Sequence, residues 1–271
     1  MLSEALENVL KKQTLKEDRT VFDDGSVEID NFQTVKELIK FENPGDTLYF
    51  IQIKKRDKDN PGQHSRYQAA MHLKEYYIKS LAELEQNENE IKSICSRENA
   101  RAYIWLNPRS KAVVDQYTER NMRAWKRNPS MGRMYGWKAQ ALAAAKSLDI
   151  DERPLCFVDV DSDDQEDINM AMKVIQTAGI TPLFAYRSVN NGIHIILPDK
   201  EQAKKLNFDA VNFRGLSPQQ IEKAKRNFTD FQKRNLKVGI EIDKPALLYT
   251  KLIPQGYDKQ NARISKAVKR L

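Results

Sequence analysis

The stretch 154-PLCFVDVDSDD-164 combines the pattern of a β-strand with an acidic end. Residues 155–161 are apolar until Asp159, which is the pattern of a strand that enters a core. Successive strand side chains alternate between faces, so Asp159 and Asp161 are predicted to lie on one face, roughly 7 Å apart. Two carboxylates this close repel each other unless a cation lies between them. Oxygen ligands of this kind suit Mg²⁺ or Mn²⁺.

A second stretch, 187-RSVNNGIHIILP-198, has the pattern of a β-hairpin. Residues 183–189 and 193–197 have the composition of strands, and Asn191-Gly192 is typical of a two-residue turn. This turn predicts that His194 begins the returning strand beside Ser188. An acidic strand end followed by a hairpin that carries a histidine indicates a site for a nucleotide and a metal.

Simpler interpretations of these residues exist. Acidic runs are commonly solvated loops, which would suit residues 163–167, whereas Asp159 interrupts an apolar strand. A calcium-binding loop would need glycine at its sixth position and glutamate at its twelfth, where this sequence has Asp164 and Met170. A lone histidine in a strand is more often structural, and only the acidic strand beside it marks His194.

The composition favours an acidic partner. The 271-residue chain has a formal net charge of +7, and nucleic acid is the commonest acidic partner of a basic protein. Basic residues concentrate between positions 101 and 138 and acidic ones between 149 and 167, a pairing typical of an enzyme that binds phosphates near metals. The two cysteines do not indicate a disulfide framework or a zinc site. Residues 1–13 indicate an amphipathic helix rather than a signal peptide, and no apolar run has membrane-spanning length, so we expect a cytoplasmic protein with no membrane partner.

The order of the predicted elements indicates an α+β fold. Residues 1–46 are interpreted as an N-terminal accessory segment with a helix at 32–41, and residues 47–271 as a catalytic core with lobes at about 47–148 and 149–271. The first lobe is a predicted αβ lobe, with strands at 48–53 and 101–106 and helices at about 66–94, 112–127 and 136–147. The second lobe alternates strands and helices at 155–161, 165–178, 183–189, 193–197, 217–235 and 237–242, followed by a strand at 246–253.

The second lobe has the element order of a split βαβ, RRM-like unit. In such a sheet the first and third strands are neighbours and the fourth lies beside the first. This order would bring Asp159, Asp161 and His194 onto one face with a carboxylate from strand 237–242. That carboxylate is either Glu241 or Asp243, and the alternation of side chains alone does not decide between them.

Three motifs in this order resemble the catalytic core of the archaeo-eukaryotic primase superfamily. That superfamily includes primase small subunits, primase-polymerases and the polymerase domains of bacterial end-joining ligases. The motifs are Phe157-Val-Asp-Val-Asp161, Gly192-Ile-His194 and Ile242-Asp243. Gly192 stands where many members have serine, but the end-joining branch also has glycine there, with a serine four residues earlier that matches Ser188. The stretch 101–109, which ends in Asn-Pro-Arg, is similar to a strand of the family, so the resemblance covers roughly residues 100–255.

The resemblance implies a template-directed nucleotidyltransferase, a small primase or primase-polymerase that joins nucleotides with two divalent metals. The metal-binding catalytic carboxylates would be Asp159, Asp161 and Asp243. The β- and γ-phosphates of the incoming nucleotide would contact Ser188 and His194. The candidate bases for the triphosphate are Arg187 and Lys251, and Arg109 is a candidate for phosphate or template. Each of these three bases could equally be an ordinary surface charge.

The segment 125–137 interleaves aromatic and basic residues, a pattern that favours single-stranded nucleic acid. The candidate contacts for the template in and beside this segment are Arg127, Arg133 and Lys138. The alternative is that Trp125 and Trp137 are core residues of two helices.

Two other classes of function remain open on the sequence. A metal-dependent nuclease could use the same acidic sheet without a triphosphate pocket. A non-catalytic module for single-stranded nucleic acid on an RRM-like fold would carry aromatics where these strands carry carboxylates. The expected partners are a single-stranded DNA or RNA template and nucleoside triphosphates. A separate helicase or other replication protein, in a bacterial, archaeal or viral context, would supply the nucleotide-binding Gly-rich loop that this sequence lacks.

Overall fold

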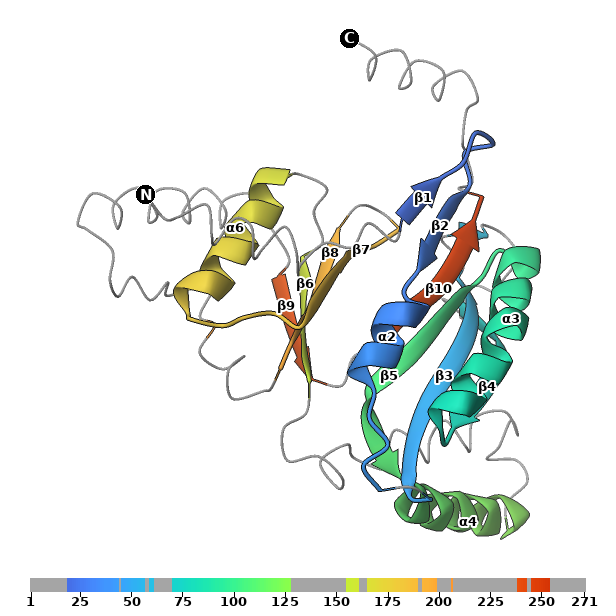
Figure 1. Ribbon diagram of the computed structural model, residues 1–271. Coiled ribbons are helices and arrows are strands. Elements are labelled where there is room, and N and C mark those ends of the chain that lie inside the picture. Colours follow the sequence, from blue (N-terminus) through green and yellow to red (C-terminus); the bar gives the residue numbers. More distant parts are fainter. Residues whose placement is uncertain are drawn as a thin grey trace. The chain divides into compact units, whose positions relative to one another are not determined.

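A computed structural model describes residues 19–43, 45–56, 59–60, 70–127, 155–160, 165–189, 192–198, 206, 238–242 and 245–253. These residues form two compact units, each built on an antiparallel sheet (Figure 1). The larger unit contains the described residues within 18–152 and 245–271, and the smaller contains those within 153–244. The α+β class predicted from the sequence is therefore confirmed. Within the described residues, no helix has both the length and the apolar character that a membrane span requires.

The larger unit contains a six-stranded sheet in the order β1-β2-β10-β5-β3-β4. Its strands are β1 (Arg19–Val21), β2 (Val27–Asp30), β3 (Thr47–Arg56), β4 (Ala70–Ile78), β5 (Arg101–Ser110) and β10 (Pro245–Leu252). Its helices are α2 (Phe32–Leu38), α3 (Leu81–Glu98) and α4 (Lys111–Arg127). Every described strand pair in this sheet is antiparallel.

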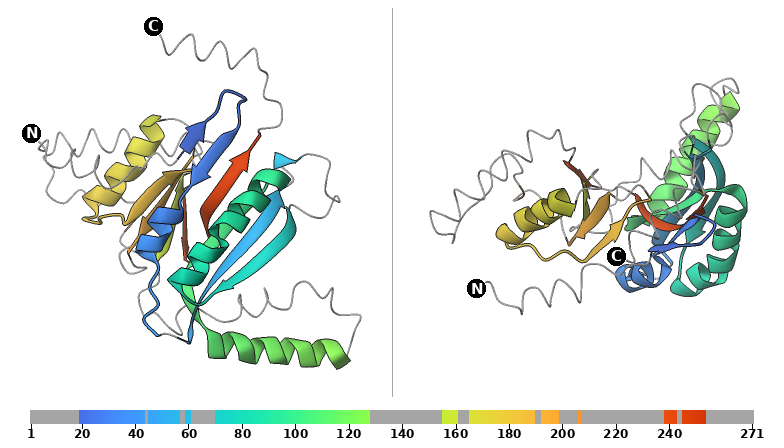
Figure 2. Two further views of the ribbon diagram at one scale, coloured as in Figure 1. Left: turned by 45° about the vertical axis from the view of Figure 1, so that its right-hand side comes forward. Right: turned by 90° about the horizontal axis from the view of Figure 1, so that it is seen from above.

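Helices α2 and α3 lie on the same face of this sheet, as both figures of the whole chain show (Figures 1 and 2). The Lys92 ammonium on α3 lies 5.1 Å from the ring centroid of Phe32 on α2 and 5.6 Å from that of Tyr249 on β10. α3 begins where the Ser80 side chain accepts a hydrogen bond from the Glu83 amide, and ends at Asn99 with a left-handed φ of 49°.

The opposite face of the sheet is covered at one end by α4. Val114 on α4 forms a buried cluster with Leu48 and Phe50 on β3, and Tyr77 and Trp105 pack against it. The next residue, Ile51, pairs with Tyr76 on β4, whose hydroxyl donates to Glu90 on α3. Because side chains alternate along a strand, Phe50 and α4 lie on the face opposite to α3.

The smaller unit contains a four-stranded antiparallel sheet in the order β7-β8-β6-β9. Its strands are β6 (Cys156–Val160), β7 (Phe184–Arg187), β8 (Ile193–Leu197) and β9 (Val238–Ile242), and its described helix is α6 (Gln165–Thr177). Alternate residues of β6 and β8 pack with Ile168 and Ile175 of α6 in one buried cluster. β6 thus lies between β8 and β9, which are the neighbours that the sequence predicted.

Two predicted elements of the larger unit were wrong in part. The helix predicted over 66–94 is a strand, β4, followed by helix α3, because Tyr76 and Ile78 are buried against β3 and outweigh the helical charge pattern around Lys74. The strand predicted to end at residue 106 continues as β5 to Ser110. Between the pairs Leu48–Arg109 and Phe50–Trp105, β5 has three residues where β3 has one. This bulge accommodates Pro108, which has no amide hydrogen to donate to a regular ladder.

The division into units also differs from the predicted lobes. The predicted accessory segment contains β1, β2 and α2, which are part of the larger unit. β10 pairs with β2 and β5, so the last strand of the predicted second lobe belongs to the six-stranded sheet instead. The helices predicted at 1–13, 136–147 and 217–235 lie outside the described residues.

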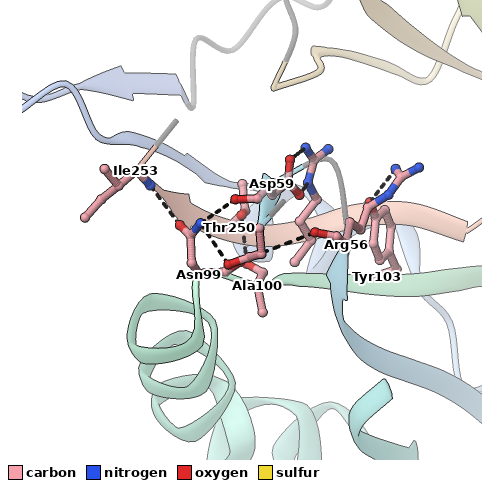
Figure 3. A network of polar contacts seen from close by, with 9 residues as sticks. Arg56, Asp59, Asn99, Ala100, Tyr103, Thr250 and Ile253 are labelled. Atoms are coloured by element: carbon pink, nitrogen blue, oxygen red, sulfur yellow. Dashed lines mark hydrogen bonds and ion pairs between the residues drawn. The ribbon is translucent and has the colours of Figure 1, made fainter. Parts of the chain in front are cut away.

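A buried polar network joins the C-terminal end of α3 to the ends of β3, β5 and β10 (Figure 3). The Arg101 guanidinium donates two hydrogen bonds to the Asp59 carboxylate, at 2.5 and 2.7 Å, and both side chains are less than a tenth exposed. The Asn99 amide donates to the Asp59 carbonyl at 3.0 Å and accepts from the Ile253 amide at 2.8 Å. These bonds bring together segments that are more than a hundred residues apart in the sequence.

We expect Asp59→Ala to lower the free energy of unfolding by about 3–5 kcal/mol, because it leaves the Arg101 charge buried without a partner. The measurement is urea unfolding followed by circular dichroism. The matched control is Glu119→Ala, which removes a 3.0 Å ion pair with Arg123 that lies on the exposed face of α4 and should change the free energy by no more than about 1 kcal/mol. Equal effects in the two variants would contradict the importance of the buried pair.

Candidate active site on the four-stranded sheet

A row of three polar side chains crosses the smaller sheet. Tyr186 on β7 pairs with His194 on β8, and His194 pairs with Asp159 on β6. Directly paired residues share a face of the sheet. The Nε2 atom of His194 lies 3.1 Å from Oδ1 of Asp159, and the Tyr186 hydroxyl lies 2.8 Å from Nδ1 of the same ring. Both nitrogens of the imidazole therefore have a protein partner.

The apolar residues of these strands fix which face carries the row. Val158 and Val160 on β6 and Ile193 and Ile195 on β8 are buried with α6. Since strand side chains alternate, Asp159 and His194 must project from the other face. The sequence thus places the two polar groups side by side through the burial of their neighbours.

Exposure increases along the row from Tyr186 to Asp159. Tyr186 is 2% exposed, whereas the side chains of His194 and Asp159 are 18% and 27% exposed. Asp159 is therefore the end of the row that a solute can reach. Tyr186 is buried, and its hydroxyl contacts Nδ1 of His194 on the side of the ring away from Asp159.

Aromatic contacts fix the orientation of the histidine ring. The Tyr186 ring stacks on Phe184 at a centroid distance of 5.4 Å and meets the His194 ring edge-on at 5.0 Å. A neutral imidazole that donates from Nε2 to Asp159 can accept at Nδ1 from the Tyr186 hydroxyl. In this arrangement each polar atom of the chain from Tyr186 to Asp159 has a complementary neighbour.

The fourth strand adds no side chain to the row, because the residue of β9 that pairs with Asp159 is Gly239. Glu241, one of the two candidates for a third carboxylate, pairs with Phe157, two residues along β6 from Asp159. The paired neighbour of Asp159 is thus a glycine on the β9 side and His194 on the β8 side.

The strand register bears on the predicted carboxylate cluster. Val160 pairs with Val238, and Cys156 pairs with Ile242. The strand ends that precede Asp161 and Asp243 therefore lie at opposite ends of the β6–β9 pair. Asp161 and Asp243 themselves lie outside the described residues. Among the residues that are described, no group of three His, Cys, Asp or Glu side chains is close enough to hold a metal ion.

The predicted two-residue turn at Asn191-Gly192 was wrong, and so was the position of His194 beside Ser188. Arg187 pairs with Ile193, and the Ser188 amide donates to the Gly192 carbonyl at 2.7 Å. Residues 189–191 lie between that pair, so the loop is longer than predicted and His194 lies opposite Tyr186. Ser188 is half-buried and lies two residues beyond the row.

Arg187 and Lys251, the candidate bases for the triphosphate, are not in the row. Arg187 pairs with Ile193, whose side chain belongs to the core beneath α6, so it lies on the face opposite to His194. Lys251 is on β10 in the larger unit, where its ammonium lies 4.4 Å from the ring centroid of Phe22.

The predicted contacts for template also fall in the larger unit or outside the described residues. Arg109 is on β5, is 3% exposed and donates to the Asn107 carbonyl at 3.2 Å, so it is a buried residue with a protein partner. Arg127 is exposed at the last residue of α4. Arg133 and Lys138 lie outside the described residues.

Sequence reasoning missed Tyr186 and Gly239. Tyr186 was missed because the predicted turn placed His194 opposite Ser188, two residues from its actual partner Tyr186. The available signal was the alternation of Phe184 and Tyr186 with Ala185, which marks an aromatic face on β7. Gly239 was read only as part of a strand.

No family model, curated protein or solved structure matched the chain significantly. The site is therefore interpreted from its own geometry and from the order of its motifs.

We expect Tyr186→Phe to lower the free energy of unfolding by about 1–2 kcal/mol, because it leaves Nδ1 of a largely buried histidine without its partner while keeping the stacked ring. Urea unfolding measures this change. The control is Tyr77→Phe, whose hydroxyl contacts Glu75 at 3.4 Å, near the limit of a hydrogen bond, and which should cost less. A Tyr186→Phe variant as stable as the original protein would show that the contact to His194 contributes nothing.

Proposed function

We propose that this protein is a template-directed nucleotidyltransferase, a small primase or primase-polymerase related to the archaeo-eukaryotic primase superfamily. The observation that carries the proposal is the contact between Asp159 and His194. It joins the acidic motif and the histidine motif of the resemblance on neighbouring strands. The strand order β7-β8-β6-β9 supports it, because this is the order of an RRM-like sheet.

Asp159 is the proposed centre of the reaction. Its carboxylate is partly exposed, one of its oxygens faces His194, and its β9 neighbour has no side chain. A carboxylate in this position fits Mg²⁺ or Mn²⁺, with Asp161 as the second ligand. For the third ligand the register favours Glu241 over Asp243, because Asp243 follows the end of the β6–β9 pair opposite to Asp161. When bound, the metals would supply Lewis-acid stabilisation of the attacking and leaving oxygens during transfer of the nucleotide.

The geometry favours His194 as a positioning residue. The resemblance implies a contact between His194 and a nucleotide phosphate, but both ring nitrogens already have protein partners. A phosphate contact would require one of these partners to be displaced. Held by Tyr186 and donating to Asp159, the imidazole instead orients the carboxylate that we propose to act in the reaction.

We expect Asp159→Asn to reduce nucleotide incorporation roughly a thousandfold or more, because the metals that it would help to hold contribute several kcal/mol to transition-state stabilisation. Two reactions are measured on single-stranded template with Mg²⁺ or Mn²⁺. They are the extension of a labelled primer and the synthesis of new primers when no primer is supplied. Asp115→Asn, which changes an exposed aspartate of α4 that pairs with Lys111, is the control for charge.

The same assay distinguishes the other classes of function. Degradation of the labelled oligonucleotide, lost in Asp159→Asn, would identify a nuclease. Binding without incorporation or degradation would identify a non-catalytic module. Full incorporation by Asp159→Asn would overturn the assignment of this carboxylate.

We expect His194→Ala to lower kcat about 10–100-fold and to raise the Mg²⁺ concentration needed for half-maximal activity, with little change in KM for the nucleotide. His194→Gln should recover part of the loss, because its side-chain amide can donate to Asp159 from a similar position. A raised KM with unchanged kcat would show instead that His194 contacts a phosphate.

A further inference from the structure

The face of the larger sheet opposite to α3 carries a row of aromatic rings. Tyr77, Phe50 and Trp105 pair across β4, β3 and β5. The Phe50 ring centroid lies 5.0 Å from that of Trp105 and 5.4 Å from that of Tyr77. Phe50 is buried in the middle, whereas Tyr77 and Trp105 keep part of their surface exposed. Val114 of α4 packs against Phe50, and Tyr77 and Trp105 also contact this buried cluster, so the rings form a platform across three strands that is only partly exposed.

Two cations lie beside this platform on the same face. Lys54 and Arg56 are two residues apart on β3, roughly 7 Å along the strand. The Lys54 ammonium lies 5.6 Å from the ring centroid of Trp105, and the Arg56 guanidinium donates to the Tyr103 hydroxyl at 3.2 Å. Tyr103 is half-buried and extends the aromatic surface next to Trp105. Each cation is therefore associated with an aromatic ring.

Neither of these two cations forms an ion pair with a carboxylate in the described part of the chain. No described carboxylate lies within ion-pair distance of Lys54 or Arg56. Glu75 shares the face, but its carboxylate accepts a hydrogen bond from Gln52 at 3.0 Å and lies near the imidazole of His72. Burial, and secondarily the nearby charge of Arg56, lowers the pKa of Lys54, and the charge of Glu75 offsets part of this effect. An anion at this face would relieve the repulsion between the two cations.

The opposite face of the same sheet provides the contrast. There, each lysine that contacts α3 or lies on it has a carboxylate partner. Lys74 pairs with Glu90 at 2.5 Å, Lys92 pairs with Asp30 and Glu88, and Lys55 pairs with Glu98 at 4.0 Å. Lys54 and Lys55, which are neighbours on β3, thus differ in whether the ammonium forms an ion pair with a described carboxylate.

We propose that this surface, formed by Lys54, Arg56, Tyr77, Tyr103 and Trp105, binds single-stranded nucleic acid. The partly exposed rings offer stacking surfaces to unpaired bases, and the two cations without an ion pair to a described carboxylate offer contacts to phosphates. A duplex would present its bases only at their edges, so single strands are the fitting ligand. The surface is distinct from the row of Tyr186, His194 and Asp159, and the inference does not rest on the proposed catalytic function.

The test uses Trp105 as its own reporter. In the full chain with Trp125→Phe and Trp137→Phe, Trp105 is the remaining tryptophan. Titration with oligothymidylate or oligouridylate should quench the emission of Trp105 until it saturates. The affinity obtained from this quenching should equal the affinity of the original protein, measured by fluorescence anisotropy of a labelled oligonucleotide. Adding Lys54→Gln and Arg56→Gln should weaken binding at least severalfold and reduce the slope of log affinity against log salt by roughly 0.7 for each lost phosphate contact.

The matched control is Lys55→Gln, which removes the same charge from the neighbouring residue on the opposite face and should leave affinity and slope unchanged. Trp105→Leu should weaken binding by roughly tenfold through lost stacking, and thermal unfolding would confirm that this variant is folded. Asp159→Asn should bind the oligonucleotide normally, so loss of incorporation in that variant does not count against this surface.

Three results would overturn the inference. Unchanged Trp105 emission, or equal salt slopes for Lys54→Gln/Arg56→Gln and Lys55→Gln, would show that this face does not bind nucleic acid. Binding of polyglutamate as tight as that of the oligonucleotides would show that the surface takes an acidic protein segment instead.

Discussion

The position of the candidate site depends on the burial of alternate apolar residues beneath α6. Val158, Val160, Ile193 and Ile195 occupy one face of the small sheet and have almost no exposed surface. A shift of one residue in β6 would move Val158 and Val160 off this face and put Asp159 in their place, and the same shift in β8 would do so with His194. Burying an unpaired carboxylate is costly, so the register is strongly determined. Asp159 and His194 meet because the core leaves them no other face.

The sequence predicted the local elements of the small unit better than the long-range pairing of the large one. Strands 155–161 and 193–197 were predicted from their apolar composition and the turn residues before the second one, and the neighbours of β6 followed from the order of elements. The position of β10 was not predictable in this way, because its partners β2 and β5 lie more than a hundred residues earlier in the sequence. β4 was misread because it leads directly into α3 and its charged residues, such as Lys74 and Glu75, are more common in helices than in strands.

The site itself was predicted in part for the same reason. The order of elements was enough to place Asp159 and His194 on one face, but the partner of His194 depends on the register of a hairpin, and that register depends on the position and length of its loop. With both of these misjudged, the histidine was assigned to Ser188 and Tyr186 was overlooked. A contact between side chains on separate strands is therefore less predictable than the face on which each one lies.

The two sheets divide their chemistry in a way that explains an apparent contradiction in the composition. The chain is basic and has interleaved aromatics, yet the strands of the small sheet carry a carboxylate and a histidine where a sheet that binds single strands carries rings. The rings and the two cations without an ion pair lie on the large sheet instead, with Trp105 and Lys54 on one partly exposed face. A carboxylate repels a phosphate unless a metal lies between them, whereas an aromatic and basic face can bind phosphates without a metal. With the proposed metal site and the proposed strand-binding surface on separate sheets, each face keeps the sign of charge that its proposed ligand needs.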